Sequence, residues 1–396
     1  MIQRITVYLF TITFSLLFLF FSNRIITDGK GMPSKANHES IQEMLKAQVI
    51  QINNRSVQKV EDDNATGEKT NENITIEFTA KISDGYKKGM KVPAVQTVDS
   101  YLPVKIKEIE VGDKILLCRI NDPKDGNYWM FAEYLRSDTL VWLGVAFMAL
   151  LIIFGQLQGI NTILSLAFTC ISVFYVLIPA ILAGKNIYFW AVCVSIFITA
   201  MTLLIVYGTS KKALCAAMGC LAGTAVSGGI ALVAGAVMKL TGVVNDESLY
   251  LLYLNPDNPI NLKAITFAAI LIGAIGAIMD VAISLSSALY EVKEKAPNTP
   301  AHEIFRSGLT IGRDMMGTMA NTLVLAYIGS SLSLVLLLIA YRTSWLGLFN
   351  RELIVAEILQ TLSGSIGILF TIPLTSLICA WIYTIKKNTK VAAQKS

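Results

Sequence analysis

Apolar and polar segments alternate along the chain, and most of the apolar segments are long enough to cross a membrane as helices. The first follows Arg4, and because no small-x-small cleavage pattern follows it, we expect an uncleaved anchor within residues 1–22. A seven-helix transmembrane domain is expected over residues 137–390, before a cytoplasmic tail at 391–396. The pattern therefore predicts a membrane all-α polytopic bundle of about eight transmembrane helices. The predicted spans are Ile5 to Phe21, Leu140 to Phe154, Thr162 to Leu182, Ile187 to Tyr207, Ala213 to Leu240, Ala264 to Tyr290, Gly317 to Tyr341 and Ala356 to Ile385.

A long polar region separates the anchor from the other spans. Residues 23–73 are polar and rich in Asn, with one short helix signal where Ser40 and Glu43 have capping-box spacing, so we expect a stalk there. Over residues 74–136 the hydrophobic period changes to two, which predicts a small all-β domain, either OB-like or another barrel or sandwich. Its predicted strands are Ile74 to Ile82, Lys91 to Val98, Tyr101 to Ile109, Lys114 to Ile120 and Tyr128 to Tyr134.

The distribution of basic residues predicts the orientation in the membrane. The chain has 33 Lys and Arg residues against 28 Asp and Glu residues. The basic residues cluster at Lys211–Lys212, in the segment from Lys293 to Arg313, and after Ile385. By the positive-inside rule these three regions are cytoplasmic, although Arg342 and Arg351 do not fit. The expected location is thus the cell membrane, with both termini cytoplasmic and the β domain extracytoplasmic.

Composition and motifs argue against a soluble enzyme or a nucleic-acid-binding protein. Apolar residues make up 54% of the chain and charged residues 15%, and no basic patch is interleaved with aromatic residues. His302–Glu303 opens like a zinc-protease helix, but no histidine follows four residues later, and no phosphate-binding loop is found. We therefore expect no enzyme activity, no cofactor, no metal and no nucleic-acid partner, and the lipid bilayer as the environment.

A carboxyl group in the sixth predicted span is the main candidate for function. Gly273, Gly276, Asp280, Ser284 and Ser287 are spaced at three or four residues and therefore share one helix face. An ionised aspartate at mid-bilayer costs about 2.5–3.5 kcal/mol on insertion scales. Asp280 is therefore expected to face the bundle interior and to find a donor, or else to stay protonated with a raised pKa. It is either a proton or cation site or a structural clamp between helices.

The seventh predicted span begins with a second polar cluster. Asp314, Thr318 and Asn321 share a face there, and a short connection makes this helix an antiparallel neighbour of the Asp280 helix. We therefore predict that Asp280 meets Asn321 or Thr322, either directly or through water. The adjacent Arg313 and Asp314 form either part of this site or an interfacial ion pair. The candidate proton- or ion-coupling residues are Asp280, Ser284, Ser287, Thr318, Asn321 and Thr322.

Several glycines in the predicted spans have small-xxx-small spacing. Such glycines allow helices to pack closely, and adjacent glycines can also break a helix that lines a cavity. Both interpretations remain open from the sequence. The candidate packing or hinge positions are Gly219, Gly223, Gly228, Gly229, Gly235, Gly273, Gly276 and Gly317.

Two of these blocks carry a family resemblance. The segments from Gly273 to Glu291 and from Gly312 to Thr322 resemble the YibE/F family of bacterial multispanning membrane proteins, although Ala320 departs from a hydroxyl residue more usual there. The resemblance implies a Gram-positive cell membrane, and a second YibE/F-like protein or a second copy as partner; it implies no particular substrate. By analogy alone, the order of helix, external domain and acidic Gly-rich helix is similar to the resistance-nodulation-division and SecD/SecF group.

These features lead to two functional hypotheses. The first is a secondary transporter or permease of unknown substrate, proton-coupled through Asp280. The alternative is a non-transporting membrane scaffold, sensor or assembly factor whose β domain binds a ligand or an envelope partner.

Overall fold

The computed structural model of the chain describes residues 2–27, 44–60, 71–98, 107–122, 126–244, 246–253, 259–340 and 344–384. The chain divides into two compact units. The barrel unit comprises Asn37–Ala149, and the helical unit comprises Met1–Ala36 together with Leu150–Ser396. Their boundary falls inside one helix, α2 (Ser137–Ser172).

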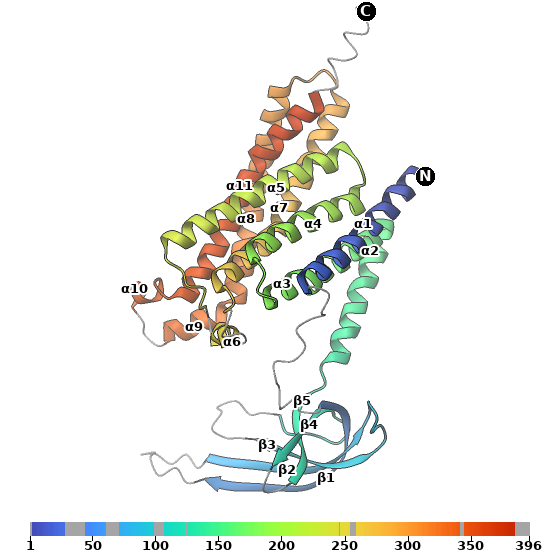
Figure 1. Ribbon diagram of the computed structural model, residues 1–396, viewed down its shortest axis with the longest axis vertical. Coiled ribbons are helices and arrows are strands. Elements are labelled where there is room, and N and C mark those ends of the chain that lie inside the picture. The colour runs from blue at the N-terminus through green and yellow to red at the C-terminus, as the bar shows by residue number, and fades with distance from the viewer. Residues whose placement is uncertain are drawn as a thin grey trace, which may run out of the picture. The chain divides into compact units, whose positions relative to one another are not determined.

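The barrel unit contains a closed five-stranded barrel with strand order β1-β2-β3-β5-β4 (Figure 1). Its pairs are antiparallel except for the parallel pair β3–β5, and β1 closes the barrel by pairing with β4. Alternate side chains fill the interior, where Phe78, Ile115 and Leu117 are fully buried. The barrel alternative of the prediction is therefore confirmed. The strands are β1 (Met44–Val60), β2 (Asn71–Ile82), β3 (Lys91–Val98), β4 (Lys114–Asp122) and β5 (Gly126–Tyr134).

The first strand corrects the prediction of a stalk. Met44–Val60 is a strand, where a helix signal within a polar stalk was expected, and Ser40 and Glu43 lie outside the described residues. Ala47 and Val49 point into the barrel, and β1 pairs along its length with β2. Pairing between distant segments thus outweighs the local helix signal.

The segment before β4 also differs from the prediction, because residues 107–110 form no strand. The side-chain amide of Gln96 holds this segment: it donates to the Lys107 carbonyl at 3.2 Å and accepts from the Ile109 N–H at 3.0 Å. On the outside, Arg55 Nε and Nη2 each donate to the Glu108 carboxylate at 2.9 Å. These hydrogen bonds hold the pKa of Glu108 below its ordinary value of 4.5.

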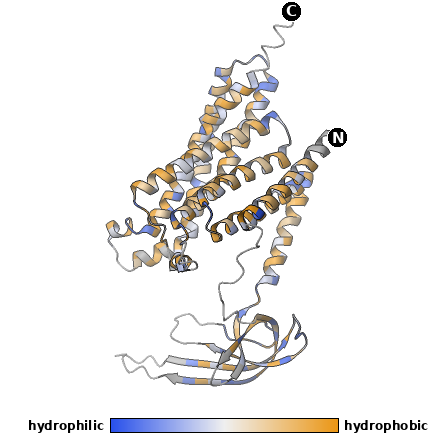
Figure 2. Cartoon of the chain, in the orientation of Figure 1, coloured by the Kyte–Doolittle hydropathy of each residue, from blue (hydrophilic) through white to orange (hydrophobic). Residues whose placement is uncertain are grey.

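Within the described residues, six helical segments are long and apolar enough to cross a membrane, which supports a multi-pass membrane protein (Figure 2). They are Tyr8–Thr27, Ser137–Leu182, Ile187–Tyr207, Lys211–Val237, Leu262–Lys295 and Glu352–Thr384. The helices are α1 (Ile2–Thr27), α2, α3 (Ile178–Leu182), α4 (Ile187–Tyr207), α5 (Lys211–Val237), α6 (Asp246–Tyr253), α7 (Leu262–Lys295), α8 (Ala301–Ser330), α9 (Leu332–Ala340), α10 (Trp345–Leu348) and α11 (Glu352–Thr384), with a π-helical turn at Val173–Leu177.

The predicted count of eight spans is not confirmed, for two reasons. The second and third predicted spans lie in one helical stretch, which is broken at Gln156 with φ 48° and ψ −125°. The break requires Gly159, because a Cβ there would overlap the backbone carbonyl of Leu151. The predicted span Gly317 to Tyr341 is instead divided between α8, which starts at Ala301, and the short α9.

Three long helices form the centre of the helical unit: α5, α7 and α11 pack on one another, and α8 packs mainly on α11 (Figure 1). Their starts follow local sequence signals, since Ser210 caps α5 and Asn261 caps α7 by accepting a backbone N–H three residues ahead. Glycines bring α5 against α11. A Cβ at Gly219 would overlap the hydroxyl of Thr375, and one at Gly223 would overlap that of Thr371.

Candidate functional site

Asp280 lies on an uncovered stripe of α7. Gly273, Gly276, Asp280 and Ser284 are all exposed and Ser287 is half-buried, so the predicted common face is confirmed. The opposite face of the helix is apolar and buried, since α5 and α11 pack against that side. The prediction that Asp280 faces the bundle interior is therefore wrong.

The carboxylate of Asp280 makes no hydrogen bond or ion pair with any residue that the structure describes. It lies within electrostatic range of Tyr207 at the end of α4 and of Cys220 on α5. Behind Cys220, the thiol and the hydroxyl of Thr199 are 3.7 Å apart, and both side chains are fully buried. The surroundings of Asp280 are thus polar toward α4 and α5, rather than toward α8 as expected.

Tyr207 also connects the site to a hollow at the end of α4. This hollow has a volume of about 580 Å³, and its lining includes Tyr8, Gln158 and Asn161 together with the turn from Leu204 to Ser210. Gln158 and Asn161 follow the break at Gln156, so the break places two amide side chains at the hollow. One tyrosine therefore contacts the polar hollow and lies near the α7 carboxylate.

The polar residues of α8 are exposed and do not bind Asp280. Thr318 donates to the Met315 carbonyl at 2.9 Å and Thr322 to the Thr318 carbonyl at 2.8 Å, so both hydroxyls are bonded within their own helix. No hydrogen bond joins Asp280 to Asn321 or Thr322. The predicted direct pairing is therefore not formed, since α8 packs mainly on α11 and these side chains are exposed.

Two contacts between α7 and α8 show which residues of the two helices lie side by side. A Cβ added at Gly308 would lie 3.1 Å from Leu289, and one at Gly273 would lie 3.6 Å from the Tyr327 ring. Both helices rise about 1.5 Å per residue. Asp280, about halfway between these contacts, therefore lies level with the part of α8 near Thr318.

Arg313 and Asp314 form no ion pair with each other or with any other described residue, and both are exposed. Adjacent residues on a helix point about 100° apart and so do not face each other. The predicted interfacial ion pair is thus not formed, and both charges stay on the outer face of α8.

The candidate glycines separate into two groups. Gly219, Gly223 and Gly228 are buried against neighbouring side chains, which supports close packing, and α5 remains helical throughout, so no break occurs at Gly228–Gly229. A Cβ at the exposed Gly273 would likewise overlap the hydroxyl of Tyr327 on α8. The second group has no such contact: a Cβ would meet nothing within 4 Å at Gly229, Gly235, Gly276 and Gly317.

Glu352, in the first turn of α11, is a residue that the sequence did not single out. Its carboxylate accepts from the N–H of Thr241 at 2.6 Å, from the hydroxyl of Thr241 at 2.8 Å and from the N–H of Gly242 at 2.5 Å. An acidic residue at a helix start is a common signal, but nothing local shows a partner 111 residues away. In the described part of the chain, no three His, Cys, Asp or Glu side chains are placed to hold one metal ion.

Six membrane-length helices together with a small closed barrel define a polytopic membrane protein with an attached β domain. The model of the family described as YibE/F-like protein matches residues 143–385, which is more than half of the chain. The chain therefore belongs to the YibE/F family, as the resemblance predicted. No curated protein and no solved structure matches it.

Proposed function

We propose that this chain is a secondary transporter or permease coupled to protons or cations, in which Asp280 carries the ion. The observation behind this proposal is a mid-helix carboxylate without a protein partner on a stripe of small residues. Holding such a group in lipid costs about 2.5–3.5 kcal/mol on insertion scales, so a functional role is the default hypothesis. The lining of the polar hollow includes Tyr207, which lies within electrostatic range of the carboxylate.

The glycines of the stripe are consistent with this proposal. With no side chain at Gly276, where a Cβ would meet nothing within 4 Å, the backbone one turn from Asp280 is open to water, a substrate or a neighbouring chain. In the proposed topology the barrel is extracytoplasmic and both termini are cytoplasmic, as the basic clusters predict. The transported substrate is not specified by these residues.

Proton binding by the purified full-length chain tests the role of Asp280. Wild type and Asp280→Asn are titrated in neutral detergent between about pH 4 and about pH 9 with a pH indicator. The control is Glu291→Gln, which removes a carboxylate from the same face of α7 about three turns away. We expect Asp280→Asn to lose one reversible proton without losing thermal stability.

Two results would contradict the proposal. Identical proton binding by wild type and Asp280→Asn would show that the carboxylate does not titrate. A lower melting temperature as the only effect would instead indicate a structural role. The Glu291 carboxylate forms an ion pair with Lys212 Nζ at 3.0 Å. Glu291→Gln therefore also measures how much stability the loss of a surface ion pair costs.

A scaffold or sensor is the second candidate, because the barrel has a core of its own and carries exposed apolar residues on one turn. Tyr86 is 80% exposed and Met90 is 54% exposed, both between β2 and β3. A photo-cross-linker at Tyr86 in native membranes should then capture one envelope component, and Met90→Ser should reduce the yield. An equal yield of cross-linked product with and without Met90→Ser would argue against recognition by this turn.

A further inference from the structure

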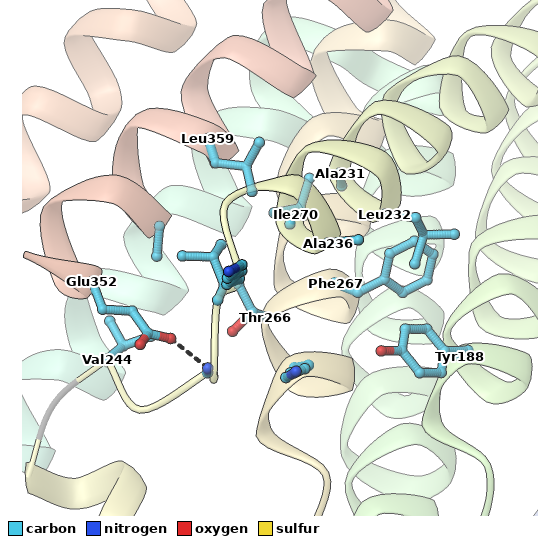
Figure 3. A pocket seen from close by; sticks show the side chains of 16 residues that line it. Tyr188, Ala231, Leu232, Ala236, Val244, Thr266, Phe267, Ile270, Glu352 and Leu359 are labelled. Carbon is cyan, nitrogen blue, oxygen red and sulfur yellow. Dashed lines mark hydrogen bonds between the residues drawn. The ribbon is translucent and has the colours of Figure 1, made fainter. Parts of the chain in front are cut away.

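A separate pocket lies at the end of the bundle where α5 ends and α4, α7 and α11 begin (Figure 3). Its volume is about 270 Å³, and its apolar walls include Tyr188, Phe267, Ile270 and Leu359. The ring centroids of Tyr188 and Phe267 are 5.2 Å apart. The Tyr188 hydroxyl points toward the side of the pocket where Thr266 and Glu352 lie (Figure 3). The pocket is about four turns of α7 from Asp280 and is not part of the site proposed above.

Charged residues border this apolar space. Lys239, Lys263 and Glu352 all contribute to the lining. The Glu352 carboxylate already accepts three hydrogen bonds from Thr241 and Gly242, as described above. The ammonium groups of Lys239 and Lys263, in contrast, form no hydrogen bond or ion pair with described residues. Among the residues that the structure describes, the pocket lining therefore has two cations without a partner, whereas its one carboxylate is engaged in holding the chain.

The backbone keeps this arrangement in place. Gly242 has φ +87°, and a Cβ there would overlap the backbone of Leu262, so the connection after α5 lies directly on the start of α7. Lys239 has φ 54°, a left-handed conformation that is uncommon outside glycine, asparagine and aspartate. It follows the last turn of α5, where the Leu240 N–H donates to the Gly235 carbonyl at 3.1 Å. A lysine at this strained position places its side chain at the pocket.

We propose that this pocket binds a small amphipathic anion, with a phosphate or carboxylate head at Lys239 and Lys263 and a short apolar body against Phe267 and Ile270. Its volume is just below the roughly 300–1,000 Å³ of pockets for drug-sized ligands, which favours a small molecule or a lipid head with the start of its chain. Ammonium groups bind such oxygens by charge-assisted hydrogen bonds. The anion is either a water-soluble organic anion or the head of an anionic lipid.

Binding of butyl phosphate to the full-length chain tests the proposal. It is titrated calorimetrically into the protein in neutral detergent, with 1-butanol as the uncharged comparison. Lys239→Asn removes the charge but keeps a residue that tolerates the left-handed conformation, and Lys263→Gln removes the second charge. The matched control is Lys211→Gln, an exposed lysine at the opposite end of α5.

We expect butyl phosphate to bind wild type and Lys211→Gln alike, and each pocket variant to bind at least about tenfold more weakly, a difference of roughly 1.4 kcal/mol. Butanol should bind no variant measurably. Unchanged affinity in both pocket variants, equal binding of butanol and butyl phosphate, or an equal loss in Lys211→Gln would overturn the proposal. So would the absence of butyl phosphate binding to wild type.

The source of the anion is distinguished in lipid nanodiscs. If phosphatidylglycerol displaces butyl phosphate and phosphatidylcholine does not, the natural occupant is a lipid head. If neither lipid displaces it, the occupant is a water-soluble anion. Asp280→Asn should bind butyl phosphate as wild type does, so a failure of this proposal is separable from a failure of the transport proposal.

Discussion

The contact between α5 and α11 at Gly223 allows a quantitative prediction. In Gly223→Ala the new Cβ would overlap the hydroxyl of Thr371, which itself donates to the Gly367 carbonyl at 2.7 Å. Overpacking of a close contact costs about 1–3 kcal/mol, and loss of the hydrogen bond adds roughly 0.5–1.5 kcal/mol. Replacing a helical glycine by alanine returns about 0.5–1 kcal/mol. The net expected loss in the free energy of unfolding is thus about 0.5–4 kcal/mol.

A matched substitution on the same helix isolates the contact. At Gly229 a Cβ would meet nothing within 4 Å, so Gly229→Ala should be neutral or slightly stabilising. The free energies of unfolding are compared by dodecyl sulfate titration in mixed micelles with circular dichroism. Thr371→Ala, combined with Gly223→Ala, should recover part of the loss, because the overlapping hydroxyl is gone. Equal stability of the two alanine variants, or no recovery in the double variant, would refute the close packing of α5 on α11.

Two further predictions concern the barrel. Phe78→Ala should lower the free energy of unfolding of the barrel by about 3–5 kcal/mol, measured by near-ultraviolet circular dichroism, whereas Tyr86→Ala, at a residue 80% exposed, should have little effect. Because hydrogen bonds from Arg55 lower the pKa of Glu108, the ion pair stabilises the folded barrel above pH 4.5 and loses this effect as the pH falls through the lowered pKa. Glu108→Gln should therefore lower the melting temperature slightly at pH 7, by an amount equivalent to at most about 1 kcal/mol. At acidic pH the substitution should have no effect. An equal shift of the melting temperature at neutral and acidic pH would contradict the role given to this ion pair.

Strands β2, β3, β4 and β5 could be predicted because their alternation of apolar and polar residues is local. The burial of β3 follows this alternation from Lys91 to Val98, as expected. β1 was missed because its inward-facing Ala47 and Val49 lie in an Asn-rich region, and its identity as a strand depends on partners in β2 and β4. Non-local pairing of this kind leaves little local signal.

The candidate site shows the same limit. The spacing of Gly273, Asp280 and Ser284 is sufficient to place them on one helix face, because helical geometry is periodic. Which face is covered depends on where α5 and α11 pack, and that information is distributed over the whole bundle. Likewise, Glu352 binds Thr241 through a contact between helix ends that no short motif contains.

The exposed polar face of α8 has a consequence for how the chain enters the membrane. α8 is not among the six described helices that are long and apolar enough to cross on their own, and its outer face carries the exposed charges of Arg313 and Asp314. The insertion machinery would therefore not release α8 into lipid as an isolated segment. Since α8 packs mainly on α11, which is synthesised later, its final placement has to wait until the last helix emerges. We therefore expect the C-terminal half of the bundle to assemble only after α11 has emerged, rather than by stepwise addition of helices.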